Sequence, residues 1–486
     1  MKNFRKWISG FLCLVLVMSC VSLVSCRKGP SESSTDETTT GESSASISLD
    51  RAECTYPADE EFYLTVTTGS KGFVTWSSSN REVASVDSKG RVLTKKAGTA
   101  IITASVGNAS ASCKLTVTET AEKDGASIRV DGNCFLSLVD GAVRLTPEYV
   151  EGESGTTAPD KQFTYRSTDE TVVTVSADGT LTPVATGTAV IVLECDGAKA
   201  SVVADVYTAG ISTPAEWMNM IADSGVFPDR IQPTDRFYLK NDIDFTGVEY
   251  DIGYTAFGTS TEKDNSHHFA SEINGNFHTV KNITEWKTDA EKNPDNHQSI
   301  FGRTVGAKVR NLAFENVVFT SAYSYGLSSV MMHHFSDMSK VQSISNQFEN
   351  ISADFIYNFD SANGKGNMAV GVTPRAYGTN LKNVFVRMRS GDAEALTDKY
   401  ENVYGFAWAE WVWYGGALSG VVILMEAVPM GEATFVNDDA GDPVYKHMKS
   451  DCYAVNTVIQ AVYYANLCFD QSVWNMTDPL SVPAFR

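Results

Sequence analysis

The amino-acid sequence predicts an all-β protein: two small β-sandwiches, followed by a right-handed parallel β-helix with a short N-terminal capping helix. Two observations predict this fold class. Residues 74–100 and 163–189 repeat one pattern of apolar residues and glycines at a constant offset of 89 positions. A second, four-residue motif then recurs between residues 280 and 458. Repeats at intervals of 20–50 residues are typical of solenoids.

The charge balance limits the kinds of partner. The chain has 486 residues, with 39 Lys and Arg against 59 Asp and Glu, which gives a formal net charge of −20. Nucleic acids and anionic lipid surfaces attract basic proteins. We therefore expect no nucleic-acid partner.

The first 26 residues have the pattern of an export signal. Three basic residues lie among the first six, and the largely apolar run 11–24 is too short and too polar for a spanning helix, which needs about 20 apolar residues. The run ends in Leu23-Val24-Ser25-Cys26, which resembles the bacterial lipobox. The resemblance implies that residues 1–26 are a lipoprotein signal, that Cys26 carries the lipid, and that the exported protein is anchored to the cell membrane, facing outside. A plain signal peptide or an uncleaved anchor helix is the alternative.

Residues 27–46 are rich in Ser, Thr and Glu and contain almost no apolar side chain. Such a segment cannot repay the entropy of folding. We expect a disordered tether.

Six cysteines follow the proposed lipid site, two in each expected domain. An even number of cysteines in an exported chain favours disulfides, although buried free thiols are the alternative. None has zinc-site spacing, and we expect no metal at them. The candidate pairs are Cys54 with Cys113, Cys134 with Cys195, and Cys452 with Cys468.

The duplicated segment consists of short alternating strands separated by Ser-Lys-Gly and Ala-Asp-Gly turns. This pattern predicts two β-sandwiches, over residues 47–120 and 126–208, with Gly90 and Gly179 at left-handed turn positions. The run from Trp76 to Ala100 (W-S-S-S-N…V-A-S-V-D…A-G-T-A) closely resembles the group 2 bacterial immunoglobulin-like (Ig-like) domain. Members of that family are spacers or adhesive modules of surface proteins and have no catalytic residues, so the resemblance implies one of these two roles.

Residues 209–486 follow a different pattern. Thr213-Pro214-Ala215-Glu216 predicts a capped helix, with Trp217, Met218 and Ile221 on one side. The recurring motif begins at Val280, Val309, Val341, Leu381, Leu418 and Val455.

Asn282, Asn311 and Asn383 occupy one position of this motif, which predicts that their amides stack as a ladder. Ile273-Asn-Gly-Asn-Phe-His-Thr-Val280 and Ser299-Ile-Phe-Gly302 resemble surface β-helix proteins with GLUG-type repeats. That resemblance implies a β-helix.

No sequence motif of a known catalytic or cofactor-binding site occurs, so no catalytic residue and no cofactor are assigned. A hydrolase or lyase site would need acids and bases on adjacent coils. The alternative is that charged residues on the outer face of the solenoid are simply solvated. The candidates are Asp354, Asp360, Lys365, Arg375, Arg387 and Arg389.

An acidic turn contains Asp438, Asp439 and Asp442 and could hold Ca²⁺, although its spacing is not that of an EF-hand. An ordinary acidic loop is the alternative interpretation.

The residues from Tyr404 to Tyr414 are unusually aromatic. In an extended strand, one set of aromatic side chains would fill the core, and the other would lie outside or under a loop. Exposed aromatic rows bind sugars or proteins. The candidates for ligand binding are Tyr404, Phe406, Trp408, Trp411 and Trp413.

Together these features favour a lipid-anchored surface protein that binds or adheres, with Ig-like stalk domains and a β-helix that recognises a glycan or a surface protein. A polysaccharide lyase or glycoside hydrolase on the β-helix is one alternative. A purely structural spacer in the cell envelope is another.

Overall fold

The computed structural model describes residues 47–486 apart from some gaps. The predicted signal, Cys26 and the tether therefore lie outside the described residues. The gaps are 59, 70–73, 81, 87–88, 107–108, 119–124, 153–154, 224–234, 252–268, 288–295, 303, 305, 329–345, 361–363, 374, 377–378, 407–408, 411–416, 427 and 430–448.

The first domain is a β-sandwich. One sheet has the strand order β2-β9-β8-β5 and the other β3-β7-β6, while β1 pairs with β4. Apolar side chains that alternate along the strands, such as Ile102 and Leu115, fill the space between the sheets. The strands are β1 (Ile47–Leu49), β2 (Glu53–Pro57), β3 (Glu61–Tyr63), β4 (Val66–Thr68), β5 (Thr75–Ser78), β6 (Ala84–Val86), β7 (Arg91–Thr94), β8 (Gly98–Val106) and β9 (Ala109–Thr118).

The second domain repeats this topology, with sheets ordered β11-β19-β18-β15 and β12-β17-β16. A third small sheet, β10-β13-β14, includes the hairpin formed by β13 and β14. The strands are β10 (Ser127–Arg129), β11 (Asn133–Ser137), β12 (Val143–Arg144), β13 (Glu148–Glu151), β14 (Thr156–Ala158), β15 (Thr164–Ser167), β16 (Val173–Val175), β17 (Thr180–Pro183), β18 (Gly187–Cys195) and β19 (Ala198–Tyr207).

The two turn glycines have the predicted conformation. Gly90 and Gly179 both have φ +82°. A Cβ on Gly90 would lie 2.6 Å from the Trp76 ring, and one on Gly179 would lie 2.8 Å from the Tyr165 ring. The aromatic residue of each copy therefore packs directly over its glycine turn.

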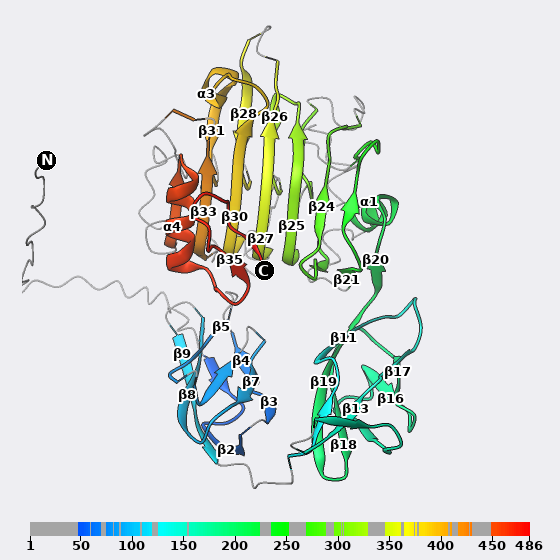
Figure 1. Cartoon of the computed structure of the whole chain (residues 1–486). Helices are drawn as coiled ribbons and strands as arrows, with labels where there is room; N and C mark the ends of the chain where they lie inside the picture. The colour runs from blue at the N-terminus through cyan, green and yellow to red at the C-terminus, as the bar shows by residue number, and fades with distance from the viewer. Residues whose placement is uncertain are drawn as a thin grey trace, which may run out of the picture. The chain divides into compact units, whose positions relative to one another are not determined.

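The remainder of the chain is built around one long parallel sheet, in the order β20-β21-β23-β25-β27-β30-β33-β34 (Figure 1). Strands β26, β28 and β31 form a second parallel sheet, and β29 pairs with β32, also in parallel. From β25 to β33 the chain passes alternately between these sheets.

The strands of this region are β20 (Ala209–Ile211), β21 (Arg236–Leu239), β22 (Ile243–Asp244), β23 (Glu272–Asn274), β24 (Thr279–Lys281), β25 (Lys308–Phe319), β26 (Tyr323–Ser324), β27 (Asn346–Tyr357), β28 (Gly366–Val370), β29 (Arg375–Ala376), β30 (Thr379–Ser390), β31 (Tyr400–Tyr404), β32 (Ala409–Glu410), β33 (Leu418–Met425), β34 (Lys449–Val455), β35 (Trp474–Asn475) and β36 (Ala484–Phe485).

Three helices are described in this region: α1 (Pro214–Asp223), α3 (Leu396–Lys399) and α4 (Val458–Cys468). The α1 capping box is present, since Glu216 accepts hydrogen bonds from Ser212 N (2.8 Å) and Thr213 N (3.1 Å). Trp217 and Ile221 are buried as expected. Met220 is buried with them, and Met218 is only partly buried.

The long sheet buries apolar side chains on both faces of its later strands. Val384 and Val386 of β30 belong to the main core, together with Val421 and Ile423 of β33. Neighbouring residues that point the other way, including Phe385, Val422 and Leu424, pack in a second cluster with α4. Helix α4 therefore covers the outer face of this end of the sheet.

The strand register corrects the predicted repeat. Val309 lies in register with Phe348, Phe348 with Leu381, Leu381 with Leu418, and Leu418 with Lys449. The motifs proposed at Val280 and Val455 are therefore out of register, because Val280 pairs with Phe314 and Val455 with Leu424. The motif proposed at Val341 lies outside the described residues. The true coil contains Phe348-Glu-Asn-Ile351, whose match to the motif was missed.

Two asparagine ladders occur instead of one. In the first ladder, the side-chain amide of Asn311 donates to Asn274 (3.2 Å), that of Asn350 to Asn311 (2.8 Å), and that of Asn383 to Asn350 (3.1 Å). Asn282 belongs to a second ladder, where it donates to Asp244 (2.9 Å) and accepts from Asn316 (2.9 Å). The prediction of stacked amides is confirmed for Asn311 and Asn383, and the placement of Asn282 beside them is wrong because β24 pairs with the second half of β25.

Candidate functional site

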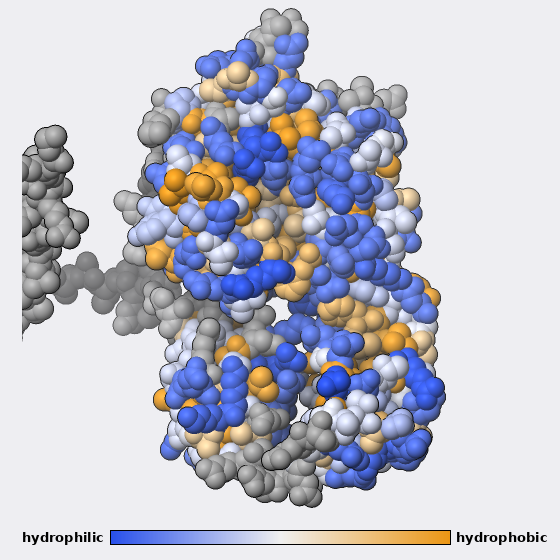
Figure 2. Space-filling view, viewed as in Figure 1, coloured by the Kyte–Doolittle hydropathy of each residue, from blue (hydrophilic) through white to orange (hydrophobic). Residues whose placement is uncertain are grey.

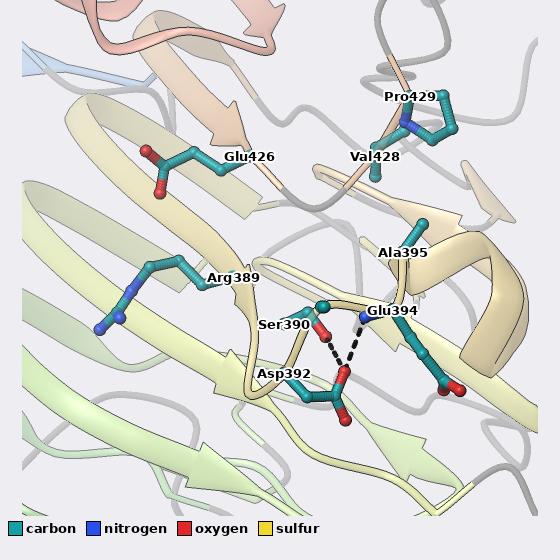
Figure 3. Close-up of a pocket in the computed structure, with 9 residues that line it drawn as sticks. Arg389, Ser390, Asp392, Glu394, Ala395, Glu426, Val428 and Pro429 are labelled. Carbon is teal, nitrogen blue, oxygen red and sulfur yellow. Dashed lines mark hydrogen bonds between the residues drawn. The ribbon is translucent and has the colours of Figure 1, made fainter.

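An open groove of about 420 Å³ lies where the strands of the long sheet end. One side consists of Arg389, Ser390 and the loop that follows β30, and the other consists of residues that follow β33 (Figure 3). Carboxylates and small apolar side chains therefore border the same space. The lining residues are Arg389, Ser390, Asp392, Ala393, Glu394, Ala395, Glu426, Val428 and Pro429.

The loop that borders the groove is held by Asp392. Its carboxylate accepts hydrogen bonds from the backbone N–H of Glu394 (2.9 Å) and from the Ser390 hydroxyl (3.1 Å). The buried ammonium of Lys399 lies 2.5 Å away. The hydrogen bond from Lys399, followed by that from Glu394, lowers the pKa of Asp392. The carboxylate is therefore charged at neutral pH and stabilises the loop.

Three of the acids and bases proposed for catalysis lie beside this groove. The Arg389 guanidinium binds both carboxylate oxygens of Asp354, at 2.8 and 2.5 Å. Arg387 donates to Glu426 at 2.7 Å. The hydrogen bond to Asp354 raises the pKa of Arg389. The register of β27, β30 and β33 thus places these residues together, and it pairs each base with an acid.

The other proposed acids and bases do not join this cluster. Lys365 donates to the Thr397 backbone carbonyl at 2.5 Å, and Asp360 is exposed. The side chain of Arg375 lies outside the described residues.

The aromatic candidates are only partly within the described residues. Phe406 is fully buried in the main core, so the prediction that it contacts a ligand is wrong. It follows Gly405, where a Cβ would lie 3.0 Å from the core residue Ile423, so the backbone lies close against the core at this point. Tyr404, at the end of β31, is half-buried. Trp408, Trp411 and Trp413 lie outside the described residues, as do Asp438, Asp439 and Asp442.

An apolar area that the sequence analysis missed lies over α4 (Figure 2). Ile459, Tyr463 and Leu467 lie at intervals of four residues along the outward side of the helix and are 58%, 60% and 62% exposed. Helix α4 has no charged residue. The i, i+4, i+8 spacing was the available signal, because such residues share one face of a helix.

The sequence analysis also missed a buried histidine–tyrosine pair. His297 Nδ1 lies 3.1 Å from the Tyr325 hydroxyl. The His297 ring contacts Tyr323 and Tyr325, with centroids 4.4 and 5.4 Å apart. His297 and Tyr325 are almost fully buried, so this contact belongs to the packing between coils.

None of the six described cysteines is joined in a disulfide bond. Cys54 and Cys113 lie side by side, with their sulfurs 3.5 Å apart. The pairing of Cys134 with Cys195 is wrong. Cys134 lies in register with Ala204, and Ala204 with Ala189, whereas Cys195 lies six residues further along β18 (195 − 189). At about 3.3 Å per residue, the separation is near 20 Å, and a disulfide needs Cα atoms about 4–7 Å apart.

The last predicted pair, Cys452 and Cys468, lies at the edge of the sheet. The Cys468 thiol donates to the Tyr464 carbonyl at 3.1 Å. Burial raises the pKa of this thiol to about 12. It is therefore protonated at neutral pH.

Across the described ranges, no three or more His, Cys, Asp or Glu side chains are grouped closely enough to hold a metal ion. Within the same ranges, no helix is long and apolar enough to cross a membrane.

Comparison with known proteins agrees with the two sandwiches. Residues 44–121 and 136–203 match the model of the bacterial Ig-like domain (group 2). The two N-terminal domains are therefore bacterial Ig-like domains of this group. A search of curated proteins found no match.

Solved structures with local similarity include fragments of an S-layer protein and a tandem of Ig repeats. Domains 5–6 of the S-layer protein SbsC are 17% identical over 33% of this chain and 96% of that one, with a TM-score of 0.18. The tandem Ig repeats of Dlar are 15% identical over 34% and 96%, with a TM-score of 0.19. In a longer SbsC structure (residues 31–844), the match spans 28% of that chain at 19% identity and a TM-score of 0.15.

Proposed function

We propose that this chain is a bacterial cell-surface lipoprotein that binds a ligand through its C-terminal domain. Cys26 is its lipid anchor, the two Ig-like domains are spacers, and the parallel-strand domain is the recognition module. The observation that carries this proposal is the order of the parts. Two Ig-like domains without candidate catalytic residues lie between a lipobox-like segment and a repetitive domain with an open groove.

The C-terminal domain has the properties expected of a parallel β-helix. Its chain passes repeatedly from the long sheet to a second parallel sheet and back. The two asparagine ladders link corresponding turns of neighbouring coils. Parallel β connections are almost always right-handed, so we assign a right-handed β-helix.

The groove is our candidate for the ligand site. Its acidic side chains can accept hydrogen bonds from hydroxyl groups, while the exposed Ala393 and Pro429 offer small apolar surfaces. This combination suits a carbohydrate, which has hydroxyl groups around an apolar ring face. The nearest acids and bases are engaged in ion pairs, Asp354 with Arg389 and Glu426 with Arg387, which favours binding over acid–base catalysis.

The test is a glycan array probed with residues 27–486, followed by affinity measurements on Glu394→Ala. Glu394 is exposed and borders the groove, and hydrogen bonds to a charged group contribute about 1.5–3 kcal/mol. We expect at least a tenfold weaker affinity. The matched control is Glu315→Ala, an exposed glutamate on β25, which should bind as the wild type does.

The other outcomes separate the alternatives. An array on which nothing binds would contradict recognition and favour a structural spacer. Release of reducing or unsaturated sugar ends from a polysaccharide would show an enzyme. Equal losses in both glutamate variants would place the binding site elsewhere.

A further inference from the structure

The first Ig-like domain contains two thiols in contact across neighbouring strands. Cys54 lies on β2 and Cys113 on β9, and their sulfurs are 3.5 Å apart. The two strands run parallel, with Cys54 opposite Leu115, so Cys113 occupies the diagonal position two residues away. Side chains at such positions on one face of a sheet can reach each other.

The second Ig-like domain provides an internal comparison. Cys134 lies on β11 at the position that Cys54 occupies on β2. Cys54 is opposite Leu115 and Cys134 is opposite Ala204. Ala204 is the equivalent of Leu115, because it follows Leu115 by the offset of 89 residues that separates the two copies. The counterpart of Cys113 at the same offset is Val202. The second domain therefore has only half of this arrangement, and Cys195 lies too far along β18 to replace the missing thiol.

We propose that Cys54 and Cys113 form a disulfide bond in the exported protein, and that Cys134 and Cys195 of the second Ig-like domain do not pair with each other. Each of the two thiols loses its proton, and a sulfur–sulfur bond forms between them. The two electrons pass to an oxidant with a disulfide of its own, which becomes a dithiol through a mixed-disulfide intermediate.

Burial limits when this bond can form. Burial raises the pKa of the Cys54 thiol to about 12 and also raises the pKa of the Cys113 thiol. The thiolate is the reactive form, so the folded domain exchanges slowly with an external disulfide. We therefore expect the bond to form more readily during folding than after it.

The bond would also change how the domain bears force. The strand β2 lies at the edge of its sheet, and its partner in that sheet is β9, the last strand of the domain. In a surface protein pulled between its anchor and a ligand, the force enters near β2 and leaves after β9. A disulfide transmits this force directly from residue 54 to residue 113 and protects the intervening segment from extension. This mechanical role rests on the proposed function, whereas the bond itself does not.

The first test maps the bond chemically. Residues 27–486 are denatured, reduced and refolded in a buffer of oxidised and reduced glutathione. The remaining thiols are then alkylated under denaturing conditions, and the chain is digested and analysed by mass spectrometry. We expect a link between Cys54 and Cys113, and alkylation of Cys134 and Cys195. Alkylation of Cys54 and Cys113, or a bond from either to another cysteine, would overturn the proposal.

The second test stretches single molecules of the same chain from its two ends. The loop between the two cysteines spans 59 residues, so the fully unfolded oxidised chain should be about 200 Å shorter than the reduced chain at roughly 3.6 Å per residue. Addition of reductant should abolish the difference. The Cys113→Ser chain should have the longer length under both conditions. Equal lengths for wild type with and without reductant would contradict the bond even if every variant folds, and neither test depends on ligand binding.

Discussion

Glu272 illustrates how single residues hold the C-terminal domain together. This glutamate on β23 is almost fully enclosed, and it contacts Arg236 of β21 (3.1 Å) and Arg310 of β25 (2.9 Å). Burial alone would raise its pKa, but the charges of Arg310 and Arg236 outweigh burial and lower the pKa below the usual value. The carboxylate thus forms ion pairs with two guanidinium groups that lie on the strands on either side of it.

We expect Glu272→Gln to destabilise the protein at neutral pH. Removing one member of a buried ion pair costs about 3–5 kcal/mol, because the remaining charge stays buried. A group with a lowered folded-state pKa stabilises the protein above its unfolded pKa, about 4.3, and loses this effect as the pH falls through the folded value. The difference in unfolding free energy between Glu272→Gln and wild type should therefore be large at pH 7 and smaller near pH 3.

Urea unfolding followed at both pH values measures this difference. Glu315→Gln, an exposed glutamate on β25, is the control and should change the free energy of unfolding little at either pH. A Glu272→Gln difference that stays constant between pH 7 and pH 3 would show that the lost charge is not the cause.

At the scale of elements, the asparagine ladders explain how successive coils turn at one place. Asn311, Asn350 and Asn383 have φ values of 52°, 52° and 53°. This left-handed conformation is unfavourable for most residues, and asparagine tolerates it because its amide bonds locally. In the next coil Gly420 has φ 62°, a value that glycine adopts without strain. The turn is therefore maintained after the amide ladder ends.

We expect Asn350→Ala to be more destabilising than Asn350→Gly. Both variants remove the two amide hydrogen bonds of Asn350 with its neighbours, a loss of about 1–3 kcal/mol for partly buried groups. Alanine adds a left-handed strain of about 1–2 kcal/mol that glycine avoids. Urea midpoints of the two variants measure the two contributions separately. Equal midpoints for the two variants would exclude the strain, and a glycine variant as stable as wild type would exclude the hydrogen bonds.

Helix α1 contributes to the stability of the C-terminal domain through its buried side. Trp217 is fully buried, and its indole N–H donates to the Tyr250 hydroxyl at 3.0 Å. We expect Trp217→Ala to cost about 3–5 kcal/mol of unfolding free energy because it leaves a large cavity. Met218→Ala, on the partly buried side of the same helix, is the matched control and should cost less. If thermal unfolding shows similar losses of stability for both variants, the buried and partly buried sides of the helix do not contribute differently.

At the scale of the whole molecule, the proposed role depends on attachment at one end and recognition at the other. The tandem Ig-like domains separate residue 26 from the C-terminal domain along the chain. A binding module placed in this way acts outside the cell only if the N-terminal end is held at the membrane.

We expect Cys26→Ala to leave the membrane fraction, or to accumulate as an unprocessed precursor, because lipid attachment requires this thiol. Fractionation of cells that express the full-length chain, with a carbonate wash, measures this directly. Cys134→Ala, which changes a thiol in the second Ig-like domain, should remain bound to the membrane. Equal retention of the Cys26→Ala and wild-type proteins would disprove anchoring at Cys26.

The sequence by itself determined the features that depend on local patterns. Alternating strands and the turns at Gly90 and Gly179 identified the two sandwiches, because a two-residue period and a left-handed glycine are properties of a few adjacent residues. The capping box at Thr213 and Glu216 identified α1 for the same reason. The Asn311 and Asn383 positions were also recognisable, since each follows the same apolar–polar pattern.

Only the tertiary structure decided which of these local units are neighbours. The strands of a parallel sheet are separated by long connections of unequal length, so spacing could not show that Asn350 lies between Asn311 and Asn383, or that Asn282 belongs to another ladder. The same limit applies to Cys134 and Cys195, which share a domain but lie far apart. It also applies to Phe406, because the aromatic run around it did not show which of its side chains fill the core. Strand register and close packing join residues that are distant in the chain, and these contacts arise only when the whole sheet assembles.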